Sequence, residues 1–578
     1  MKRYFNLKRV LVKGTFFCLI GFGFSNSSYA QLNEAVNNVH GNFQIDMQNC
    51  QTDTVTGAED KQGENFRYNA FGNVNYISGD FSMGFRYESY NPVMLGFPDA
   101  YSNKSGIPYR YARYKHKDID VTVGNFYEQF GSGLIFRTYE DRGLLYDNAM
   151  DGFRAIVTPK NGITLKGIIG KQRVFWGLSD GILKGFDGEI NITELFDSLN
   201  KSKTKFIIGG SFVSKFQDDK NPSLVLPKNV GCFGGRANIL NENFNFYGEY
   251  AYKINDPSYQ NQYSYKDGQA LYLSSSYAQK GFSVLLSGKY VDNMSYRSDR
   301  SQQLTSAMIN FLPALSKPHT YLMMAYYPYA SQPNGEVGGS IDVQYKVKKE
   351  TWLGGKYGMD ININGSIFYG TDTTNISPTL DSVRQYKYSV NPAGVGDKYF
   401  HDVNIEISKK INKKVKCTFM YANQFLNASI VQSGTTSKEE HPDVYSNIFV
   451  FDLTYRYKTG SAIRTESQLF LGQYNKGDVS HLTDSQKKDG VTGSWVTETI
   501  EWTPTSRWFF VLVDQFNYSN PTDYKKLHYY YGGITYVSGP SRIMLSYGRQ
   551  RQGIFCAGGV CRQVPAFTGF QLSISSSF

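Results

Sequence analysis

The sequence has few prolines and, beyond its first 30 residues, no long hydrophobic run. It contains 18 Pro in 578 residues, and its mean hydropathy is −0.42. A helical protein with several membrane spans would need runs of about 20 apolar residues and a positive mean hydropathy, so that class is excluded. No linker, change of composition or long amphipathic helix divides the chain into the several soluble domains that its length alone would suggest.

Aromatic residues and glycine are abundant. Phe, Tyr and Trp make up 16% of the chain, with 45 Tyr and 40 Phe beside 56 Gly. A disordered chain would lack these aromatics. Together with charged residues spread throughout, this composition favours many half-buried β-strands.

The N-terminus has the three parts of a secretory signal. Basic residues from Lys2 to Lys13 precede a mainly apolar stretch over 11–24, and Ser28 and Ala30 supply small residues before a cleavage point. We expect residues 1–30 to be a Sec-type signal peptide and 31–578 to be the mature protein. Five of the 61 Lys and Arg residues and no acidic residue lie in the signal, which leaves a dispersed net charge of +6. A nucleic-acid partner is therefore not expected.

Apolar and polar residues alternate along many segments of about 9–13 residues. Because successive side chains of a strand point to opposite faces, each such segment has one apolar and one polar face. A soluble sandwich would show the same alternation, but these lengths match tilted strands that cross a bilayer. Clear examples are 81–88, 337–345, 359–367 and 449–456.

The connections between these segments alternate between short and long, which is typical of barrels with short periplasmic turns and long external loops. We predict an all-β protein, one closed antiparallel transmembrane barrel of about 26 strands, with a range of 22–26. The weakest strand assignments are 42–49, 184–192 and 302–312. Because lipid permits no open sheet edge, the array must close.

The C-terminus is the most specific signal. Phe570, Leu572 and Ile574 share one face of a last strand that ends at Phe578, and this ending resembles the recognition signal of outer-membrane barrel proteins. We therefore predict an integral location in the outer membrane of a Gram-negative cell, with membrane lipid and a barrel-assembly machine as partners. Aromatic residues near strand ends predict interfacial girdles, namely Tyr87, Tyr90, Tyr109, Tyr111, Tyr326, Tyr327, Trp502, Trp508, Tyr529, Tyr530 and Tyr531.

The segment 128–151 differs from an ordinary surface loop because bulky apolar residues are mixed with dense charge. We hypothesise that it folds into the barrel mouth or lumen and narrows it; the alternative is an external loop that packs on its neighbours. In the first case its charges would face inward-pointing arginines of the wall and set ion and solute selectivity. The candidate lumen residues are Glu128, Arg137, Glu140, Asp141, Arg142, Asp147 and Asp151, with Arg86, Arg110 and Arg154 on the wall.

The sequence contains one weak match to a catalytic motif and no metal-binding motif. Residues 177–181 match G-x-S-x-G in letters, but the motif needs a strand-to-helix elbow, and no helix is predicted after it. A Gly-rich and Ser-rich external turn is the preferred interpretation. Neither a zincin motif nor a phosphate-binding loop occurs, so we predict no enzyme, no metal and no cofactor.

Five cysteines remain after signal removal, so an odd one is left over. Cys556 and Cys561 lie in one Gly-rich segment at a spacing that a small disulfide loop can close. We expect them to be bridged. Cys50 is the competing partner, because the first and last strands are neighbours in a closed barrel.

Several motifs resemble an uncharacterised, porin-like outer-membrane barrel family of Bacteroidetes-type bacteria, defined by a domain of unknown function. The resemblance spans the mature chain and implies a barrel in the cell envelope, but no activity. It rests on residues 126–134, 139–142, 147–149, 547–551 and 558–562.

A barrel of 22–26 strands must be filled, plugged or open. Only about ten residues separate the signal from the first strand, which argues against the N-terminal plug of a TonB-dependent receptor. The leading function is a porin-like or translocon-like pore for polar solutes or for a segment of a partner protein. The alternative is a non-transporting scaffold for a secretion or surface-lipoprotein complex, with a periplasmic or surface partner. An outer-membrane hydrolase is a poor third.

Overall fold

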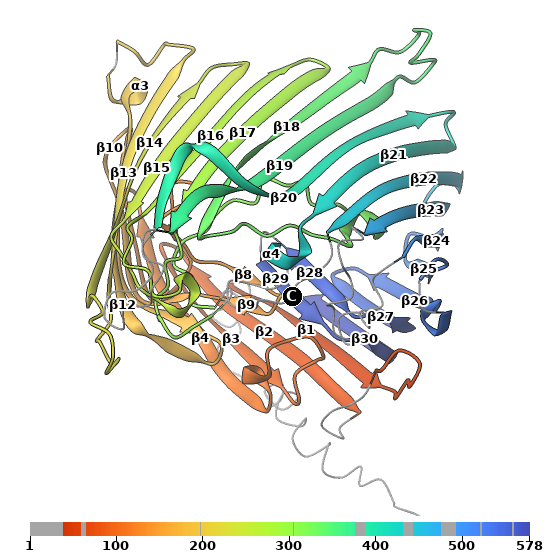
Figure 1. The fold of residues 1–578 in the computed structure, drawn as a ribbon, viewed down its shortest axis with the longest axis horizontal. Helices are drawn as coiled ribbons and strands as arrows, with labels where there is room; N and C mark the ends of the chain where they lie inside the picture. Colours follow the sequence, from red (N-terminus) through yellow and green to blue (C-terminus); the bar gives the residue numbers. More distant parts are fainter. Residues whose placement is uncertain are drawn as a thin grey trace, which may run out of the picture.

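A single closed sheet dominates the molecule. The structure is a computed structural model that describes residues 38–58, 65–196, 198–303, 306–375, 388–431, 443–474, 493–520, 523–557 and 560–578. Within these residues, 24 strands form one antiparallel ring, in which each strand pairs with its neighbours along the chain and β1 pairs with β30 (Figure 1). The all-β barrel and the predicted range are confirmed. The central figure of 26 is too high by two.

The strands of the ring follow the expected alternation of inward and outward residues. Their bounds are β1 Val39–Cys50, β2 Phe66–Ser78, β3 Phe81–Tyr90, β4 Lys104–His116, β5 Ile119–Phe126, β10 Met150–Lys160, β11 Ile163–Val174, β12 Gly177–Asn191, β13 Lys205–Phe216, β14 Asn229–Leu240, β15 Phe244–Lys253, β16 Gly268–Gln279, β17 Phe282–Asp292, β18 Gly335–Val347, β19 Met359–Asn375, β20 Tyr388–Lys410, β21 Val415–Leu426, β22 Val444–Lys458, β23 Ser461–Tyr474, β24 Trp495–Thr505, β25 Trp508–Phe516, β26 His528–Ser538, β27 Ser541–Gln550 and β30 Phe567–Ser577.

Smaller elements lie in the connections. No helix of the described residues is long and apolar enough to cross a membrane. The short strands are β6 Gln129–Phe130, β7 Phe136–Arg137, β8 Glu140–Asp141, β9 Tyr146–Asp147, β28 Gly553–Ala557 and β29 Val560–Val564, and the short helices are η1 Asp99–Tyr101, α3 Ile192–Leu195, η2 Tyr259–Asn261, η3 Met323–Ala325, α4 Ala428–Val431 and η6 Asp523–Lys525.

One end of the barrel carries mostly short turns, such as 79–80, 117–118 and 459–460, and we call it the turn rim. The other end, the loop rim, carries most of the long connections. The longest is residues 293–334, between β17 and β18. It includes 302–312, so the strand predicted there is wrong: this stretch lies in a loop and adds no strand to the ring.

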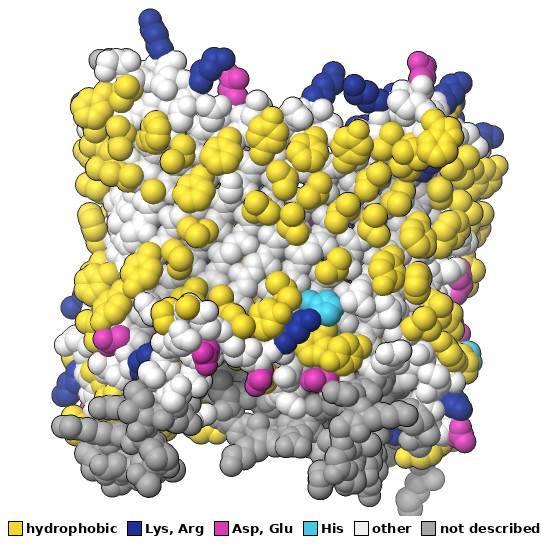
Figure 2. Space-filling view, turned by 45° about the horizontal axis from the view of Figure 1, so that its top comes forward, with side chains coloured by type: hydrophobic (Ala, Val, Ile, Leu, Met, Phe, Trp, Pro, Cys, Tyr) yellow, Lys and Arg dark blue, Asp and Glu magenta, His cyan; other side chains and the backbone are white. Residues whose placement is uncertain are grey.

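The outer face of the barrel is apolar. On β22, Phe449, Phe451 and Tyr455 are exposed, whereas the alternate residues Ile448 and Val450 are buried. Figure 2 shows hydrophobic side chains spread as a broad band over the visible outer face, with Lys and Arg at its upper rim. Such a band would cost about 25 cal/mol for each Å² left in water, and a bilayer removes that cost.

The chain end takes part in closing the ring. The Phe578 N–H donates to the Gly41 carbonyl oxygen at 2.9 Å, and the Gly41 N–H returns a bond of 3.0 Å. A Cβ at Gly41 would lie 2.4 Å from the Phe578 ring, so the absence of a side chain at Gly41 leaves room for this ring. The role of Phe578 as an insertion signal stays a prediction.

Several of the predicted girdle residues do not face lipid. Tyr90 and Tyr529 are only 1% and 7% exposed and pack in clusters inside the ring. Tyr326 and Tyr327 are only 3% and 4% exposed, because they belong to the loop 293–334 and pack inside the ring. Tyr109 stacks on Tyr127 at 5.5 Å, and the Tyr111 hydroxyl donates to Asn75 at 3.1 Å, so both face inward. Trp502 and Trp508 are exposed on the outer face, as expected.

Candidate functional site

Two loops from the loop rim fold into the ring of strands. We call residues 127–149 the inner loop and residues 293–334 the crossing loop. Figure 1 shows the hairpin β8–β9 of the inner loop and the green crossing loop within the ring. Their buried residues join clusters formed by inward-facing wall residues of many strands, so both loops occupy part of the lumen.

The inner loop consists of two small hairpins, β6–β7 and β8–β9. Gly131 and Gly133 have positive φ angles of 54° and 101° in the first turn, a backbone that glycine adopts without strain. There the Ser132 N–H donates to the Glu249 carboxylate at 2.7 Å. Four apolar side chains of this hairpin are almost fully buried against β13, β14 and β15, namely Phe130, Leu134, Ile135 and Phe136.

A buried group of charges, which we call the clamp, holds the second hairpin to the wall. Arg86 of β3 pairs with Glu88 at 2.6 Å, with Glu140 at 2.9 Å and with Asp147. Arg173 of β11 pairs with Glu88 at 2.7 Å and with Asp147 at 2.8 Å. Because the charges are desolvated, removal of one partner leaves another buried and unpaired, at a cost of about 3–5 kcal/mol.

A second set of charges surrounds Glu128, the residue that precedes the hairpin β6–β7. Glu128 accepts bonds from Arg154 at 3.2 Å and from Lys166 at 2.9 Å, and Arg154 also reaches Asp120 at 3.0 Å. These pairs neutralise the carboxylate where the inner loop leaves the wall. Arg154 therefore contacts the inner loop through Glu128.

The remaining predicted residues fall into two groups. Arg137 lies over the Phe311 ring at 4.0 Å, Arg142 pairs with Glu140 at 2.8 Å, and Asp141 accepts the Leu144 N–H at 3.1 Å, all within the loop region. Arg110 and Asp151 differ, because their side chains pair with each other at 3.1 Å on the outer face of the barrel.

The expectation that Arg110 points inward is thus wrong. Its side chain is 58% exposed, and its neighbours Tyr109 and Tyr111 take the inward positions of β4.

Burial changes the acidity of the inner-loop tyrosines. Tyr127 and Tyr146 are enclosed by apolar and charged neighbours, and this burial raises the pKa of both phenols well above the usual value, helped by the charge of Asp147. Both therefore stay neutral hydrogen-bonding groups. The Tyr127 hydroxyl donates to Asp147 at 3.0 Å, which adds a further link to the clamp.

The crossing loop is hydrogen-bonded to the inner loop through the backbone. The Arg137 N–H donates to the Ile309 carbonyl at 2.9 Å, and the Phe311 N–H donates to the Gly133 carbonyl at 2.9 Å. The Asn148 amide also donates to the Met308 carbonyl at 3.1 Å. The two loops therefore form one structural unit inside the barrel.

One end of the crossing loop is anchored on the wall around β12–β15. The Tyr296 hydroxyl lies 3.3 and 3.0 Å from the carbonyl oxygens of Val213 and Val230, and the Gly181 N–H donates to Ser298 at 3.0 Å. Asp256 pairs with Lys215 and, at 2.8 Å, with Arg300. Burial opposes ionisation of Asp256, but these two cations outweigh it and hold the pKa of the carboxyl below its usual range.

The other end reaches the wall strands β19–β25. The Met323 N–H donates to Gln468 of β23 at 2.9 Å, and the Tyr326 hydroxyl donates to Gln515 of β25 at 2.6 Å. Tyr329 stacks on the neighbouring rings of Phe368 and Phe400, with ring centroids 4.7 and 5.0 Å away. The crossing loop thus extends through the lumen from β12 to β25.

The loop is also paired to wall carboxylates on this side. The His319 imidazole lies 2.5 Å from Asp402 of β20, and Lys317 donates to Asn404 at 3.3 Å. Farther toward the turn rim, Arg464 pairs with Asp452 at 2.8 Å and with Glu501 at 3.1 Å. The inner wall of β20–β24 is therefore polar and rich in carboxylates.

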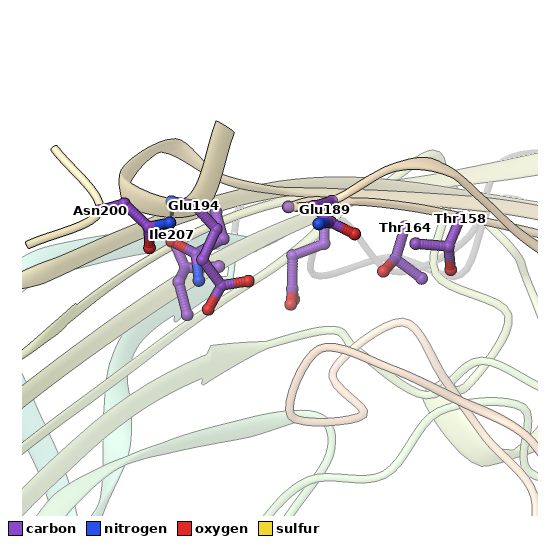
Figure 3. A pocket seen from close by; sticks show the side chains of 9 residues that line it. Thr158, Thr164, Glu189, Glu194, Asn200 and Ile207 are labelled. Atoms are coloured by element: carbon purple, nitrogen blue, oxygen red, sulfur yellow. Dashed lines mark hydrogen bonds between the residues drawn. The ribbon is translucent and has the colours of Figure 1, made fainter. Parts of the chain in front are cut away.

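A polar cavity of about 400 Å³ lies at the turn rim. Figure 3 shows Thr158, Thr164, Glu189 and Glu194 projecting from one stretch of wall toward the lumen. Arg236 donates to Glu189 at 2.9 Å, and Lys205 pairs with Glu194 at 3.1 Å. The remaining lining residues are Asn161, Gly162, Asn191, Asn200 and Ile207.

The other predicted features have simple positions. Ser179 of the G-x-S-x-G match lies on β12, not at an elbow or a turn, and its hydroxyl donates to the Gly181 carbonyl at 3.2 Å.

Cys556 and Cys561 are register partners of the β28–β29 hairpin, but their side chains fall outside the described residues, as does the predicted signal peptide. Among described residues, no group of three or more His, Cys, Asp or Glu could hold a metal.

Several site residues were missed from the sequence. Lys166 and Glu249 each occupy an inward position of an ordinary alternating strand, so nothing distinguishes them locally. Arg173 follows the buried Gln172 at an irregularity in the pairing of β11 with β12, where two successive side chains are buried, so strict alternation would place Arg173 on the outer face. The crossing loop could have been suspected from the apolar, non-alternating stretch 321–329.

These features define the class of the protein: a closed β-barrel with an apolar outer band, integral to the outer membrane, with a lumen occupied by its own loops. The chain belongs to a family of unknown function, DUF6029, whose sequence pattern matches residues 7–578. The bacterial group suggested by the motifs stays a prediction. No curated protein matches the chain.

Solved structures of outer-membrane barrels are similar at low identity. The P pilus usher (PapC) translocation pore is 9% identical, with a TM-score of 0.42, 93% of this chain and 99% of that chain covered. The siderophore receptor PirA from Pseudomonas aeruginosa is 9% identical, with a TM-score of 0.38, 94% and 80% covered. The outer membrane transporter YddB from Escherichia coli is 9% identical, with a TM-score of 0.38, 93% and 81% covered.

Proposed function

We propose that this protein is a pore for polar solutes, narrowed by the inner loop and the crossing loop. The observation that carries the proposal is the path of the crossing loop, which is anchored on β12 through Ser298 and on β25 through Tyr326. A segment that extends between distant strands of the ring divides the lumen. Solutes must then pass beside it, so it limits their size.

Polar side chains on the inner wall suit passage of hydrated solutes. Inward positions toward the turn rim carry amides, hydroxyls and charges, among them Asn73, Asn75, Asn362, Glu406, Arg464 and Glu501. Groups of this kind can replace part of the hydration shell of a passing solute.

The charges of the inner loop have a different role from the one the sequence suggested. Glu128, Glu140 and Asp147 are all engaged by wall cations. We propose that they position the loop, and that passing solutes meet the more exposed carboxylates, such as Glu189 and Glu501.

The test uses replacement of each loop by a short turn. Asp292 and Gly335 are register partners, and so are Phe126 and Met150, so a tight turn can join each strand pair without disturbing the ring. We expect single-channel conductance in planar bilayers to rise several-fold without residues 293–334, and less without 127–149. The matched control shortens 348–358 at the turn rim, where Val347 pairs with Met359, and should leave conductance unchanged.

Unchanged conductance in both loop replacements, with an intact barrel by circular dichroism, would overturn the proposal. It would favour the second candidate, a non-transporting scaffold for a secretion or surface-lipoprotein complex. The tight packing of the crossing loop on both sides of the lumen also fits that candidate. A stoichiometric partner in a pull-down without solute flux in liposome swelling would establish it.

A further inference from the structure

We propose that the turn rim beside β18–β20 is a binding surface for anionic phospholipid headgroups. This basic patch is formed by the turn 348–358 together with the turn 411–414. It presents an exposed tryptophan, Trp352, among lysines. The inference is independent of the pore function, since it concerns the outside of the barrel.

The tryptophan is held outward by an ordered turn. Within it, the Glu350 N–H donates to Gly355 at 2.7 Å, and the Gly355 N–H donates to Thr351 at 2.8 Å. Trp352 itself is 93% exposed. A rigid turn that leaves a whole indole in water would be unfavourable, whereas the headgroup region of a bilayer is where Trp side chains are enriched.

The turn also leans toward the lipid-facing side of the barrel. Lys409 of β20 donates to the Leu353 carbonyl at 2.9 Å, and it occupies the same parity as Ile407 and Ile405. Leu353 and Ile411 are more than half exposed beside it. The patch therefore continues the apolar outer band beyond the last turn of the wall.

The positive charge of the basic patch favours anionic lipid headgroups over neutral ones. Residues 346–360 and 408–416 contain nine lysines against two carboxylates, and one of these, Asp360, lies 3.5 Å from Lys346. Lysines at a membrane surface attract anionic lipids, and this attraction is weakened by salt. Because short turns of such barrels face the periplasm, the lipids concerned are phospholipids of the periplasmic leaflet.

Other turns of the same rim provide a control. The turns at 79–80, 117–118 and 241–243 mix Asp80, Lys117, Asp118 and Glu242 and contain no tryptophan. Lys117 lies in one of these turns, and Lys160 and Lys280 lie at the neighbouring turns 161–162 and 280–281 of the same rim. All three are exposed, and their charges can be reversed in the same way as those of the patch lysines.

The experiment measures access to Trp352 in full-length protein reconstituted into vesicles of phosphatidylcholine, with or without phosphatidylglycerol. The Trp352 signal is the difference between wild type and Trp352→Phe, and acrylamide is the aqueous quencher. We expect phosphatidylglycerol to protect Trp352, with the protection lost at high salt. The variant Lys348→Glu, Lys349→Glu, Lys356→Glu should abolish this protection, and retained phosphatidylglycerol in native mass spectrometry should fall about tenfold or more.

The control variant Lys117→Glu, Lys160→Glu, Lys280→Glu should behave as wild type. Equal quenching of Trp352 in both vesicle types would overturn the proposal, and so would an equal effect of the control variant. Protection that appears only on addition of a soluble anionic polymer, polyglutamate, would also overturn it, since the occupant would then be an acidic macromolecule rather than lipid.

Discussion

The backbone N–H of Arg137 donates a hydrogen bond of 2.9 Å to the carbonyl oxygen of Ile309. This bond joins two loops that leave the wall at distant strands, β5 and β17. With the matching bond from Phe311 to Gly133, it makes the two loops one continuous structure inside the barrel. Loosening either loop should therefore affect the other.

Removing a clamp cation should free the second hairpin of the inner loop. Arg173→Ala leaves Glu88 and Asp147 buried with Arg86 as their remaining arginine partner, and we expect a loss of about 3–5 kcal/mol in local stability. Hydrogen exchange of residues 139–148 measures it. Arg142→Ala, at a partly exposed pair, is the control and should cost about 0–1 kcal/mol. Equal protection in both variants would contradict a clamp.

One hydroxyl contributes two contacts to the anchor of the crossing loop on β13 and β14. Tyr296→Phe removes the group that contacts the Val213 and Val230 carbonyls while keeping the ring, so we expect about 1 kcal/mol less stability for residues 294–298. Hydrogen exchange of that segment is the measurement. Tyr524→Phe changes a largely exposed tyrosine and should have no effect. A similar response in both variants would show that the hydroxyl does not anchor the loop.

The barrel could be predicted from the sequence because its signal is local. Alternation within β19 or β22 depends on residues two positions apart, and the short turns separate the strands clearly. The crossing loop lacks such a period. Its burial depends on contacts such as Met323 with Gln468, 145 positions away, which no local pattern records.

The site was predicted in part for the same reason. The unusual mixture of charged and apolar residues distinguished the inner loop from an ordinary surface loop. The wall residues that its charges contact could not be identified from the sequence. Strict alternation after the inward Gln172 would turn Arg173 outward, and only the irregular register of β11 in this region brings Arg173 to Glu88. Arg110 was assigned to the wrong face because Tyr109 and Tyr111 suggested a lipid girdle, whereas the inner loop gives Tyr109 an aromatic partner inside.

Acid should release the crossing loop near Asp256. Since Lys215 and Arg300 hold the pKa of this carboxyl below its usual 3.8, the ionised form stabilises the loop at neutral pH. That contribution is present above about pH 3.8 and is lost as the pH falls through the lowered value. We expect exchange of residues 294–303 to increase at low pH in wild type. In Asp256→Asn it should be raised at neutral pH and change little on acidification; a steep acid response in that variant would assign the effect to another group.

The register of the β28–β29 hairpin places Cys556 directly opposite Cys561. Opposed positions of an antiparallel pair have Cα atoms about 4.5–5.5 Å apart, within the range that a disulfide spans. The oxidising periplasm through which an outer-membrane protein passes permits the bond to form. Peptide mapping without reductant should therefore recover residues 556 and 561 in one cross-linked species. A link from either residue to Cys50, which pairs with Gly569 at the closure of the ring, would instead establish the competing bridge, and alkylation of both as thiols would exclude the disulfide.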